Sequence, residues 1–437
     1  MKILTKRELI EQRIARRSTV STVEPTVKAI IERVKSNKDA ELIAMTKKFD
    51  GVELQELRVS EQEISDAYGK VSSSLLQALR DALERIQRFH FRQKEESWKF
   101  EPESGVLLGQ QIRPLASAGI YIPGGKASYP STVLMNAIPA KLAGVERIVL
   151  TTPPETGGSV NAAVLVAANL CGVDEIYKVG GAQAIAALAY GTESIQAVHK
   201  ITGPGNAYVA CAKKLVFGDV SIDMIAGPSE VCIWADEQSN LAFVAADLLA
   251  QAEHDEDATA CCIVPTVDYA EALSKEVFTQ LEKMDRKDIA RKSITGNGWI
   301  AVVESDDEAI GIINELAPEH LEIMTSEPEK RLQDIHHAGA IFIGAYSPEA
   351  LGDYMAGPNH TLPTSGTAKF SSPLGVYDFM KKTSIIRYNE QALERVGEAI
   401  IELAQSEQLT GHAQAIQVRR KGYTNEGLDN YTKNSGD

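Results

Sequence analysis

The sequence predicts an α/β protein built on mainly parallel sheets, and three observations support this prediction. From about residue 107 onward, short runs rich in β-branched residues alternate with apolar segments of helical length. The alternation pauses near AGPSE and then resumes, so two consecutive α/β units are expected. With 437 residues, 44% of them hydrophobic, the chain can bury the cores of two or more domains. Strands joined by helical crossovers pair in parallel, which fixes the expected fold class.

The first hundred residues are expected to be helical. Ser60 and Glu63 have the spacing of a capping box, which marks the start of a helix. Apolar residues at helical spacing follow it: Ile64, Tyr68, Val71, Leu75, Leu79, Leu83 and Ile86. No residue type here suggests chemistry, so we predict packing helices.

The first α/β unit is expected to have strands at GIYIPG, RIVLTTP, EIYKVG and HKITGPG. The second is expected to have strands at EVCIWAD, ACCIVP, WIAVVES, LEIM and AIFIGAY, with Gly227-Pro228 as a hinge between the units. Beyond Gly375 we predict two further helical stretches, PLGVYDFMKKTSII and NEQALERVGEAIIELAQSEQL. The polar tail NEGLDNYTKNSGD is expected to be loose.

Charge and cysteine usage exclude several classes of function. A formal net charge of −15 and a pI near 5.2 argue against nucleic acid or an anionic membrane as partner, because both would repel this surface. The first residues have scattered charges and no apolar core, unlike a secretory signal. Five cysteines with neither disulfide spacing nor a C-x-x-C pair fit a reducing, cytoplasmic compartment. Cys261 and Cys262 lie in an apolar run and are expected to be buried, inert thiols.

The pair Glu319-His320, in ELAPEHLEIM, suggests oxidation of an alcohol beyond the aldehyde. A histidine can take the hydroxyl proton while hydride leaves, and an adjacent carboxylate can activate water for the second oxidation. The alternative is a helix-to-strand junction with both side chains in water. Sequence physics alone gives the two interpretations about equal weight.

Several residues are candidate metal ligands, each with an ordinary structural alternative. Gln251 and His254 lie three apart on a predicted helix, but Gln is a poor zinc ligand and a helix-end histidine is slightly favoured. Asp353 and His360 lie in the loop-like segment ALGDYMAGPNHTLPTSGT, where turn hydrogen bonding is equally plausible. His412, in EQLTGH, would by itself be a surface histidine.

Glycine-rich turns occur in GIYIPGGKASYPS, KVGGAQA and ITGPGNAYV, each after a predicted strand and before a helix. Backbone N–H groups at such turns can meet phosphate. The chain has no G-x-G-x-x-G fingerprint and no P-loop pattern, so tight turns without a ligand remain the simpler interpretation.

Taken together, these segments resemble histidinol dehydrogenases over nearly the whole chain. The resemblance is carried by GIYIPGGKASYPSTVLMNAIPAKLAGV, VGGAQAIAALAYGTE, ITGPGNAYV, IDMIAGPSE, LLAQAEHD, APEHLEIM, GDYMAGPNHTLPTSGTAKFSSPLGVYDF and EQLTGH. It implies two similar incomplete Rossmann-like (aldehyde-dehydrogenase-like) domains with helical N-terminal and C-terminal extensions, in a domain-swapped homodimer. The implied parts are an N-terminal extension (1–23), a larger α/β domain with the metal and catalytic residues (24–118 with 231–374), an NAD-binding domain (119–230) and a swapped C-terminal extension (375–437).

The resemblance also implies a reaction and a role for each matching residue. The family oxidises L-histidinol through L-histidinal to L-histidine with two NAD, and Glu319 and His320 would be the catalytic pair. One zinc ion per subunit would be held by Gln251, His254, Asp353 and His412. The substrate would contact these four ligands together with Ser229, His320, His360 and Glu407. NAD would contact Tyr121, Gln183 and Asn206, and Glu407 and His412 would complete the partner's site.

One departure from the family pattern is visible, and three rival functions stay open. The family commonly has Gly between Glu407 and Leu409, where this chain has Gln408; the change would cost about 1 kcal/mol if the position needs a positive φ. The rivals are a zinc- and NAD-dependent dehydrogenase of another amino-alcohol or diol, a zinc hydrolase with Glu319 as base, and a non-catalytic metal-binding protein.

Overall fold

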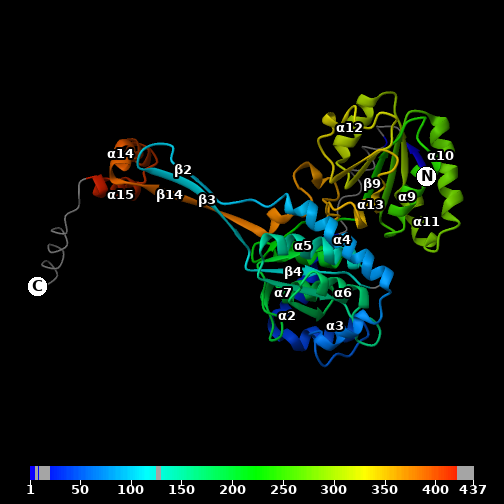
Figure 1. The fold of residues 1–437 in the computed structure, drawn as a ribbon, viewed down its shortest axis with the longest axis horizontal. Helices are drawn as coiled ribbons and strands as arrows, with labels where there is room; N and C mark the ends of the chain where they lie inside the picture. The colour runs from blue at the N-terminus through cyan, green and yellow to red at the C-terminus, as the bar shows by residue number, and fades with distance from the viewer. Residues whose placement is uncertain (5–7, 9–19, 125–128, 421–437) are drawn as a thin grey trace, which may run out of the picture. The chain divides into compact units, whose positions relative to one another are not determined.

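The computed structural model describes residues 1–4, 8, 20–124 and 129–420, and it is drawn in Figure 1. The chain divides into two compact units, each described separately below. The first comprises residues 1–94 and 114–379, and the second comprises residues 95–113 together with the chain from 380 onward. The predicted polar tail and most of the predicted N-terminal extension lie outside the described residues.

The first unit contains a five-stranded parallel sheet in the order β6-β5-β4-β7-β8, as predicted from the strand-helix alternation. Its strands are β4 (Ser117–Tyr121), β5 (Arg147–Thr152), β6 (Glu175–Lys178), β7 (Lys200–Thr202) and β8 (Ser221–Ile222). The crossover helices are α5 (Pro130–Ala143), α6 (Ala162–Leu170), α7 (Gly181–Tyr190) and α8 (Ala207–Val216). The chain moves outward from β4 in both directions, so the strand order reverses between β4 and β7. In open parallel sheets, ligands bind at the carboxyl ends of the strands beside this reversal.

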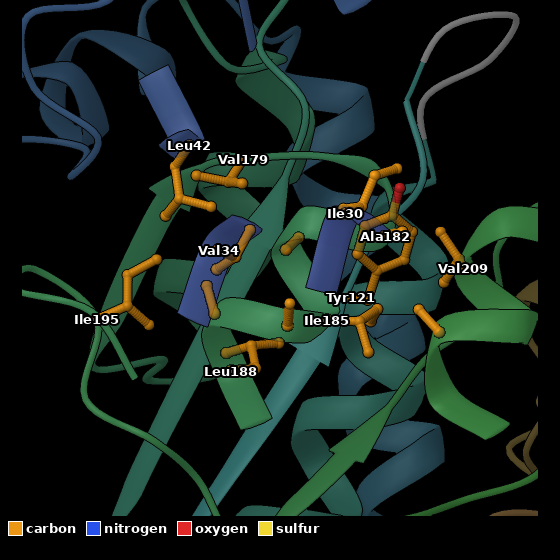
Figure 2. Close-up of a cluster of buried hydrophobic side chains, with 14 of the residues drawn as sticks. Ile30, Val34, Leu42, Tyr121, Val179, Ala182, Ile185, Leu188, Ile195 and Val209 are labelled. Carbon is orange, nitrogen blue, oxygen red and sulfur yellow. The ribbon is translucent and has the colours of Figure 1, made fainter. Parts of the chain in front are cut away.

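Helices from the first hundred residues pack on this sheet. They are α2 (Val20–Phe49), α3 (Glu61–Tyr68) and α4 (Ser73–Phe91). The predicted capping box is confirmed, since Ser60 Oγ accepts from the Glu63 N–H and Glu63 Oε2 accepts from the Ser60 N–H. Figure 2 shows Ile30 and Val34 of α2 in one apolar cluster with Ile185 of α7. The sequence prediction of packing helices is therefore confirmed.

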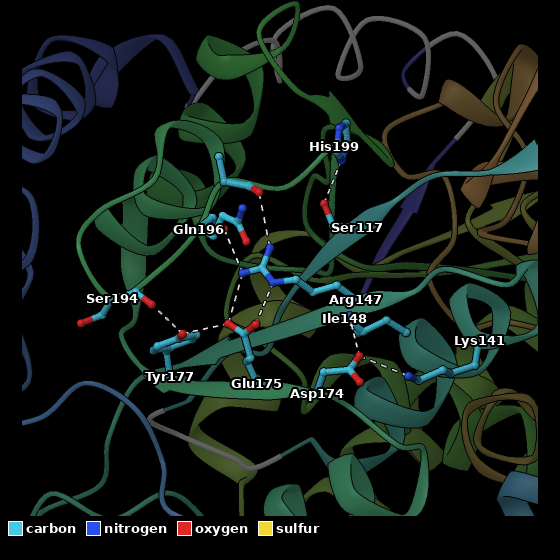
Figure 3. A network of polar contacts seen from close by, with 11 residues as sticks. Ser117, Lys141, Arg147, Ile148, Asp174, Glu175, Tyr177, Ser194, Gln196 and His199 are labelled. Carbon is cyan, nitrogen blue, oxygen red and sulfur yellow. Dashed lines mark hydrogen bonds and ion pairs between the residues drawn. The ribbon is translucent and has the colours of Figure 1, made fainter.

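A polar network ties together the amino ends of strands in the same sheet (Figure 3). The Arg147 guanidinium donates to both carboxylate oxygens of Glu175, at 2.7 and 3.1 Å, and to the carbonyl of Gln196 at 3.1 Å. The Tyr177 hydroxyl lies 2.8 Å from Glu175 Oε2. Arg147 and Glu175 are the first residues of β5 and β6, so this network fastens the edge opposite the glycine-rich turns.

The first unit also contains a six-stranded parallel sheet in the order β1-β11-β10-β9-β12-β13. Its strands are β1 (Lys2–Leu4), β9 (Glu230–Trp234), β10 (Thr259–Val264), β11 (Trp299–Val302), β12 (His320–Ile323) and β13 (Ala340–Ile343). Its helices are α9 (Leu241–Ala252), α10 (Val267–Leu281), α11 (Lys287–Gly296), α12 (Asp306–Leu316) and α13 (Glu349–Tyr354). Cys261 and Cys262 are buried in β10, and burial raises the pKa of both thiols well above the usual value, as expected for inert cysteines.

The second unit is a small sheet with two helices. The strands β2 (Trp98–Phe100), β3 (Val106–Pro114) and β14 (Met380–Tyr388) have the order β14-β3-β2. Helices α14 (Glu390–Ser406) and α15 (Thr410–Arg420) pack against each other, and the Arg420 guanidinium pairs with Glu394.

One helix prediction was wrong. The stretch PLGVYDFMKKTSII forms a short 3-10 turn, η3 (Val376–Phe379), and then strand β14. Its β-branched residues suit a pleated strand, and β3 lies beside it as a pairing partner. Such a partner, which is distant in sequence, overrides local helix propensity. Within the described ranges, no helix is both long and apolar enough to cross a bilayer.

Candidate active site

The predicted catalytic pair, Glu319 and His320, lies at the amino end of β12, beside the amino end of β9. Glu319 and His320 are only 5% and 4% exposed, so the alternative with both side chains in water is wrong. Glu319 Oε2 accepts a hydrogen bond from the Glu230 N–H at 2.8 Å. His320 Nδ1 lies 3.0 Å from the Glu230 carbonyl oxygen, an acceptor only, so Nδ1 carries the proton and donates it. The other ring nitrogen, Nε2, is buried without a hydrogen-bond partner among the described residues.

Burial sets the protonation of this pair. Desolvation lowers the pKa of His320 to about 4, against the opposing charge of Asp353, so the imidazole is neutral near pH 7. Desolvation also raises the pKa of the Glu319 carboxyl well above its usual value. The result is an imidazole with a free lone pair at Nε2, which is the form a general base requires.

The end of α9 and helix α13 bring two of the four predicted metal ligands, His254 and Asp353, to one place. His254, Glu349 and Asp353 each offer a ligand atom, and these three atoms lie within 4.8 Å of one another. Gln251 is fully buried on α9. When its amide is oriented with the nitrogen toward Glu349, that nitrogen lies 2.9 and 3.1 Å from the two Glu349 carboxylate oxygens. Its amide oxygen is then the end available to an ion. An imidazole nitrogen with carboxylate and amide oxygens is a donor set that fits zinc.

Glu349 was missed by the sequence analysis. It is 2% exposed at the start of α13, four residues before Asp353 and therefore on the same face of that helix. Its Oε1 lies 3.9 Å from His320 Nδ1. The i, i+4 pair of acids in SPEALGDY was the available signal, but two acids at that spacing are also common on solvated helices.

His360 and Ser229 lie beside these groups. His360 Nδ1 is 3.1 Å from the Asp353 carbonyl oxygen, and His360 Nε2 is 3.2 Å from Thr132 Oγ1. The local hydrogen bonding that was considered for this loop is therefore present, and the histidine side chain is only 13% exposed. Burial lowers the pKa of His360, with the Asp353 charge opposing it. Ser229 directly precedes β9 and accepts from the Thr259 N–H through its carbonyl at 2.9 Å.

Glu407 and His412 belong to the second unit, where both are exposed. Glu407 is the C-cap of α14, and the next residue, Gln408, has φ of +59°. The Gln408 N–H donates to the Gln405 carbonyl and the Leu409 N–H donates to the Ala404 carbonyl, which together form a Schellman motif. The position that the family commonly fills with Gly is thus left-handed here.

The predicted NAD contacts gather at the carboxyl edge of the five-stranded sheet, beside the reversal of strand order. Tyr121 ends β4, Gln183 lies in the first turn of α7 and Asn206 is the N-cap of α8. The Tyr121 hydroxyl accepts from the Gly181 N–H at 3.1 Å. Asn206 Oδ1 accepts from the first turn of its helix, so its amide N–H groups are the part left for a ligand. This crevice is where a parallel sheet binds a dinucleotide.

The turn that leads to Asn206 is held by a buried ion pair. Lys213 and Asp223 form a salt bridge with both side chains at most 2% exposed. Lys213 Nζ donates to the Gly203 carbonyl at 2.9 Å, and Asp223 Oδ2 accepts from the Gly203 N–H at 2.8 Å. Gly203 has φ of +115°, and a Cβ there would lie 2.1 Å from the Tyr121 carbonyl oxygen. Only glycine fits this turn.

Comparison with known proteins identifies the family. The family model described as histidinol dehydrogenase matches residues 14–420. The chain belongs to the histidinol dehydrogenase family. It is 54% identical to the histidinol dehydrogenase of Bacillus thuringiensis subsp. konkukian over 96% of this chain and 97% of that protein. It is 53% identical to the histidinol dehydrogenase of Oceanobacillus iheyensis over 96% of this chain and 99% of that protein.

Solved structures agree with this assignment. The crystal structure of histidinol dehydrogenase from Elizabethkingia anophelis matches with a TM-score of 0.88 and 42% identity, covering 91% of this chain and 92% of that one. Apo betaine aldehyde dehydrogenase of Staphylococcus aureus matches with a TM-score of 0.50 and 10% identity, over 85% and 83% of the two chains, a likeness of fold alone. As a member of this family, the chain is an NAD-dependent oxidoreductase that acts on histidinol, in the last steps of histidine biosynthesis.

Proposed function

We propose that this chain carries out the complete four-electron oxidation of L-histidinol, through L-histidinal, to L-histidine, with two NAD and one zinc ion per subunit. The observation that carries the proposal is the buried, unpartnered Nε2 of His320 beside the ligand cluster of α9 and α13. A base held in its neutral form at neutral pH is what removal of an alcohol proton requires.

Zinc would be held by Gln251, His254 and Asp353 of one subunit and by His412 of its partner. When bound, zinc would polarise the substrate alcohol and orient it through the amine and imidazole. Manganese or cobalt would also suit these donors. The fit rests on the His254 imidazole and the Asp353 carboxylate, which lie in one cluster with Glu349, and on Gln251, whose amide lies against Glu349.

The protein groups would act in sequence. His320 takes the hydroxyl proton at Nε2 while hydride passes to the nicotinamide. Glu319 then takes a proton from water, which attacks the aldehyde, and the hydrate loses a second hydride to a second NAD. Glu319 suits this step because its buried carboxyl is fixed by the Glu230 N–H, and its raised pKa makes it a stronger base than a solvated carboxylate.

The remaining contacts divide between substrate and coenzyme. Ser229, His320, His360 and Glu407 would bind histidinol together with the zinc ligands. Tyr121, Gln183 and Asn206 would bind NAD at the carboxyl edge of the five-stranded sheet, beside the reversal of strand order.

The working enzyme would be a homodimer in the cytoplasm. Glu407 and His412 belong to the second unit and the other predicted ligands to the first, and the swapped dimer that the family resemblance implies would deliver them to the partner's site. The domain boundaries that were predicted from the sequence also belong to this proposal. A dilute monomer should lack activity, which sedimentation and assay at the same concentration would test.

The decisive experiment is the yield of NADH per L-histidinol consumed by zinc-loaded enzyme, with the product identified by chromatography. Two NADH and histidine are expected from the wild type. Glu319→Gln keeps the size of the side chain and an acceptor for the Glu230 N–H, so it should yield one NADH and histidinal. Glu304→Gln, at an exposed site, is the matched control and should behave as wild type. Absence of NADH from the wild type would favour the hydrolase or the other-alcohol alternatives.

A further inference from the structure

Glu349 is a buried carboxylate to which the proposed mechanism gives no role. It is 2% exposed and starts helix α13. When the Gln251 amide is oriented with its nitrogen toward Glu349, that nitrogen lies 2.9 and 3.1 Å from the two carboxylate oxygens. Its own N–H donates to Glu322 Oε1 of β12 at 2.7 Å. The residue therefore joins α9, α13 and β12 at the point where the predicted zinc ligands meet.

Gln251 needs such a partner if it is to act as a ligand. A primary amide has a donor end and an acceptor end of nearly equal size, and only the oxygen end can bind a cation. A free amide would present either end. A carboxylate accepts hydrogen bonds and cannot donate them when ionised, so Glu349 selects the orientation with the Gln251 nitrogen toward itself.

We propose that Glu349 is a positioning residue of the metal site, holding Gln251 so that its amide oxygen faces the ion. The inference rests on the proposed zinc site and goes beyond it by assigning a residue outside the ligand set. Hydrogen-bonded partners of this kind fix a ligand's orientation and commonly change metal affinity 10- to 100-fold. They matter most for a weak neutral ligand such as Gln, because it has no charge of its own to orient it.

A direct ligand role for Glu349 is the main competing assignment, since one of its oxygens lies in the 4.8 Å cluster with His254 and Asp353. The geometry favours positioning, because both oxygens of Glu349 lie within hydrogen-bond distance of the Gln251 amide when its nitrogen is turned toward them. The hydrogen bond from the Glu349 backbone N–H to the Glu322 carboxylate of β12 also holds the residue in place.

A double-mutant cycle on the full-length, metal-depleted protein distinguishes the roles, with zinc itself as the probe. Zinc affinity is measured by chelator competition for the wild type, Glu349→Ala, Gln251→Ala and the double variant. Glu349→Ala should weaken zinc by roughly 10- to 100-fold. In the Gln251→Ala background the same change should have no further effect, because Glu349 acts only through Gln251. Glu349→Gln keeps a carbonyl acceptor for the amide and should lose less affinity than Glu349→Ala.

Each other outcome overturns the inference. Additive losses in the double variant would make Glu349 an independent ligand. Unchanged zinc affinity in both Glu349 variants would leave it a purely structural residue. NAD affinity, measured by fluorescence, serves as the control for folding, because the proposed NAD site lies on the five-stranded sheet. If Glu349→Ala does not bind NAD normally, the comparison is made with Glu349→Gln instead. A wild type that binds no zinc would overturn the proposed metal site itself, whereas zinc binding that is insensitive to Glu349 would overturn this inference alone.

Discussion

Replacing His320 by glutamine should remove a loss of stability that the wild type suffers on acidification. Burial lowers the pKa of folded His320 from 6.5 to about 4. Above pH 6.5 the His320 side chain is neutral in both the folded and the unfolded chain, so its titration does not change the free energy of unfolding. As pH falls from 6.5 toward 4, the unfolded chain binds a proton that the folded chain does not, so the folded state loses stability. The full loss, reached below pH 4, is about 3 kcal/mol, and about 2 kcal/mol is reached by pH 5.

The assay is urea unfolding of metal-depleted wild type and His320→Gln at about pH 7.5 and about pH 5. The free energy of unfolding of the wild type should fall by about 2 kcal/mol more than that of the variant. Glu319 and Glu349 are present in both proteins, so the comparison reports His320 together with its interactions with these two carboxyls. His336→Gln, at an exposed histidine, controls for the loss of an imidazole.

The result that would refute this reasoning is a difference of the opposite sign. The Glu319 and Glu349 oxygens lie 3.8 and 3.9 Å from His320 Nδ1 and would stabilise an imidazolium if both were ionised. The wild type would then gain stability relative to the variant as pH falls. Such a gain would show that the charges of the site, rather than its burial, decide the protonation of His320.

Three further outcomes are expected from chemical unfolding. Asp223→Asn leaves the Lys213 ammonium buried without its carboxylate and should cost about 3–5 kcal/mol; a loss below about 1 kcal/mol would contradict the role of that ion pair. Gln408→Gly should raise stability by up to about 1 kcal/mol, because Gln408 has a positive φ that glycine adopts without strain. Asp50→Asn should stabilise the protein at neutral pH, since Asp50 Oδ2 is buried without a donor among the described residues and burial raises the pKa of its carboxyl. Because burial raises the pKa of the folded carboxyl above its usual value, the gain should shrink as pH falls toward about 4 and should be absent below it. A gain that persists below about pH 4 would argue against a charge effect.

The sequence by itself determined the fold class and much of its order. Alternating strands and helices required parallel sheets, since parallel strands need long crossovers, and the two sheets agree. The capping box at Ser60 could be predicted from the sequence because it is a local contact between residues three apart. The stretch PLGVYDFMKKTSII misled the analysis because its state as strand β14 depends on pairing with β3, a partner far away in sequence.

The chemistry of the site could be predicted only in part from the sequence. Glu319 and His320 were credible from their side chains, and the roles of the predicted zinc ligands came from family resemblance. Tertiary structure decided the rest. Burial of His320 separates a general base from a surface histidine, and the meeting of α9 with α13 brings Glu349 to the Gln251 amide. Desolvation and hydrogen bonding depend on neighbours that the chain assembles only on folding, and no local pattern encodes them.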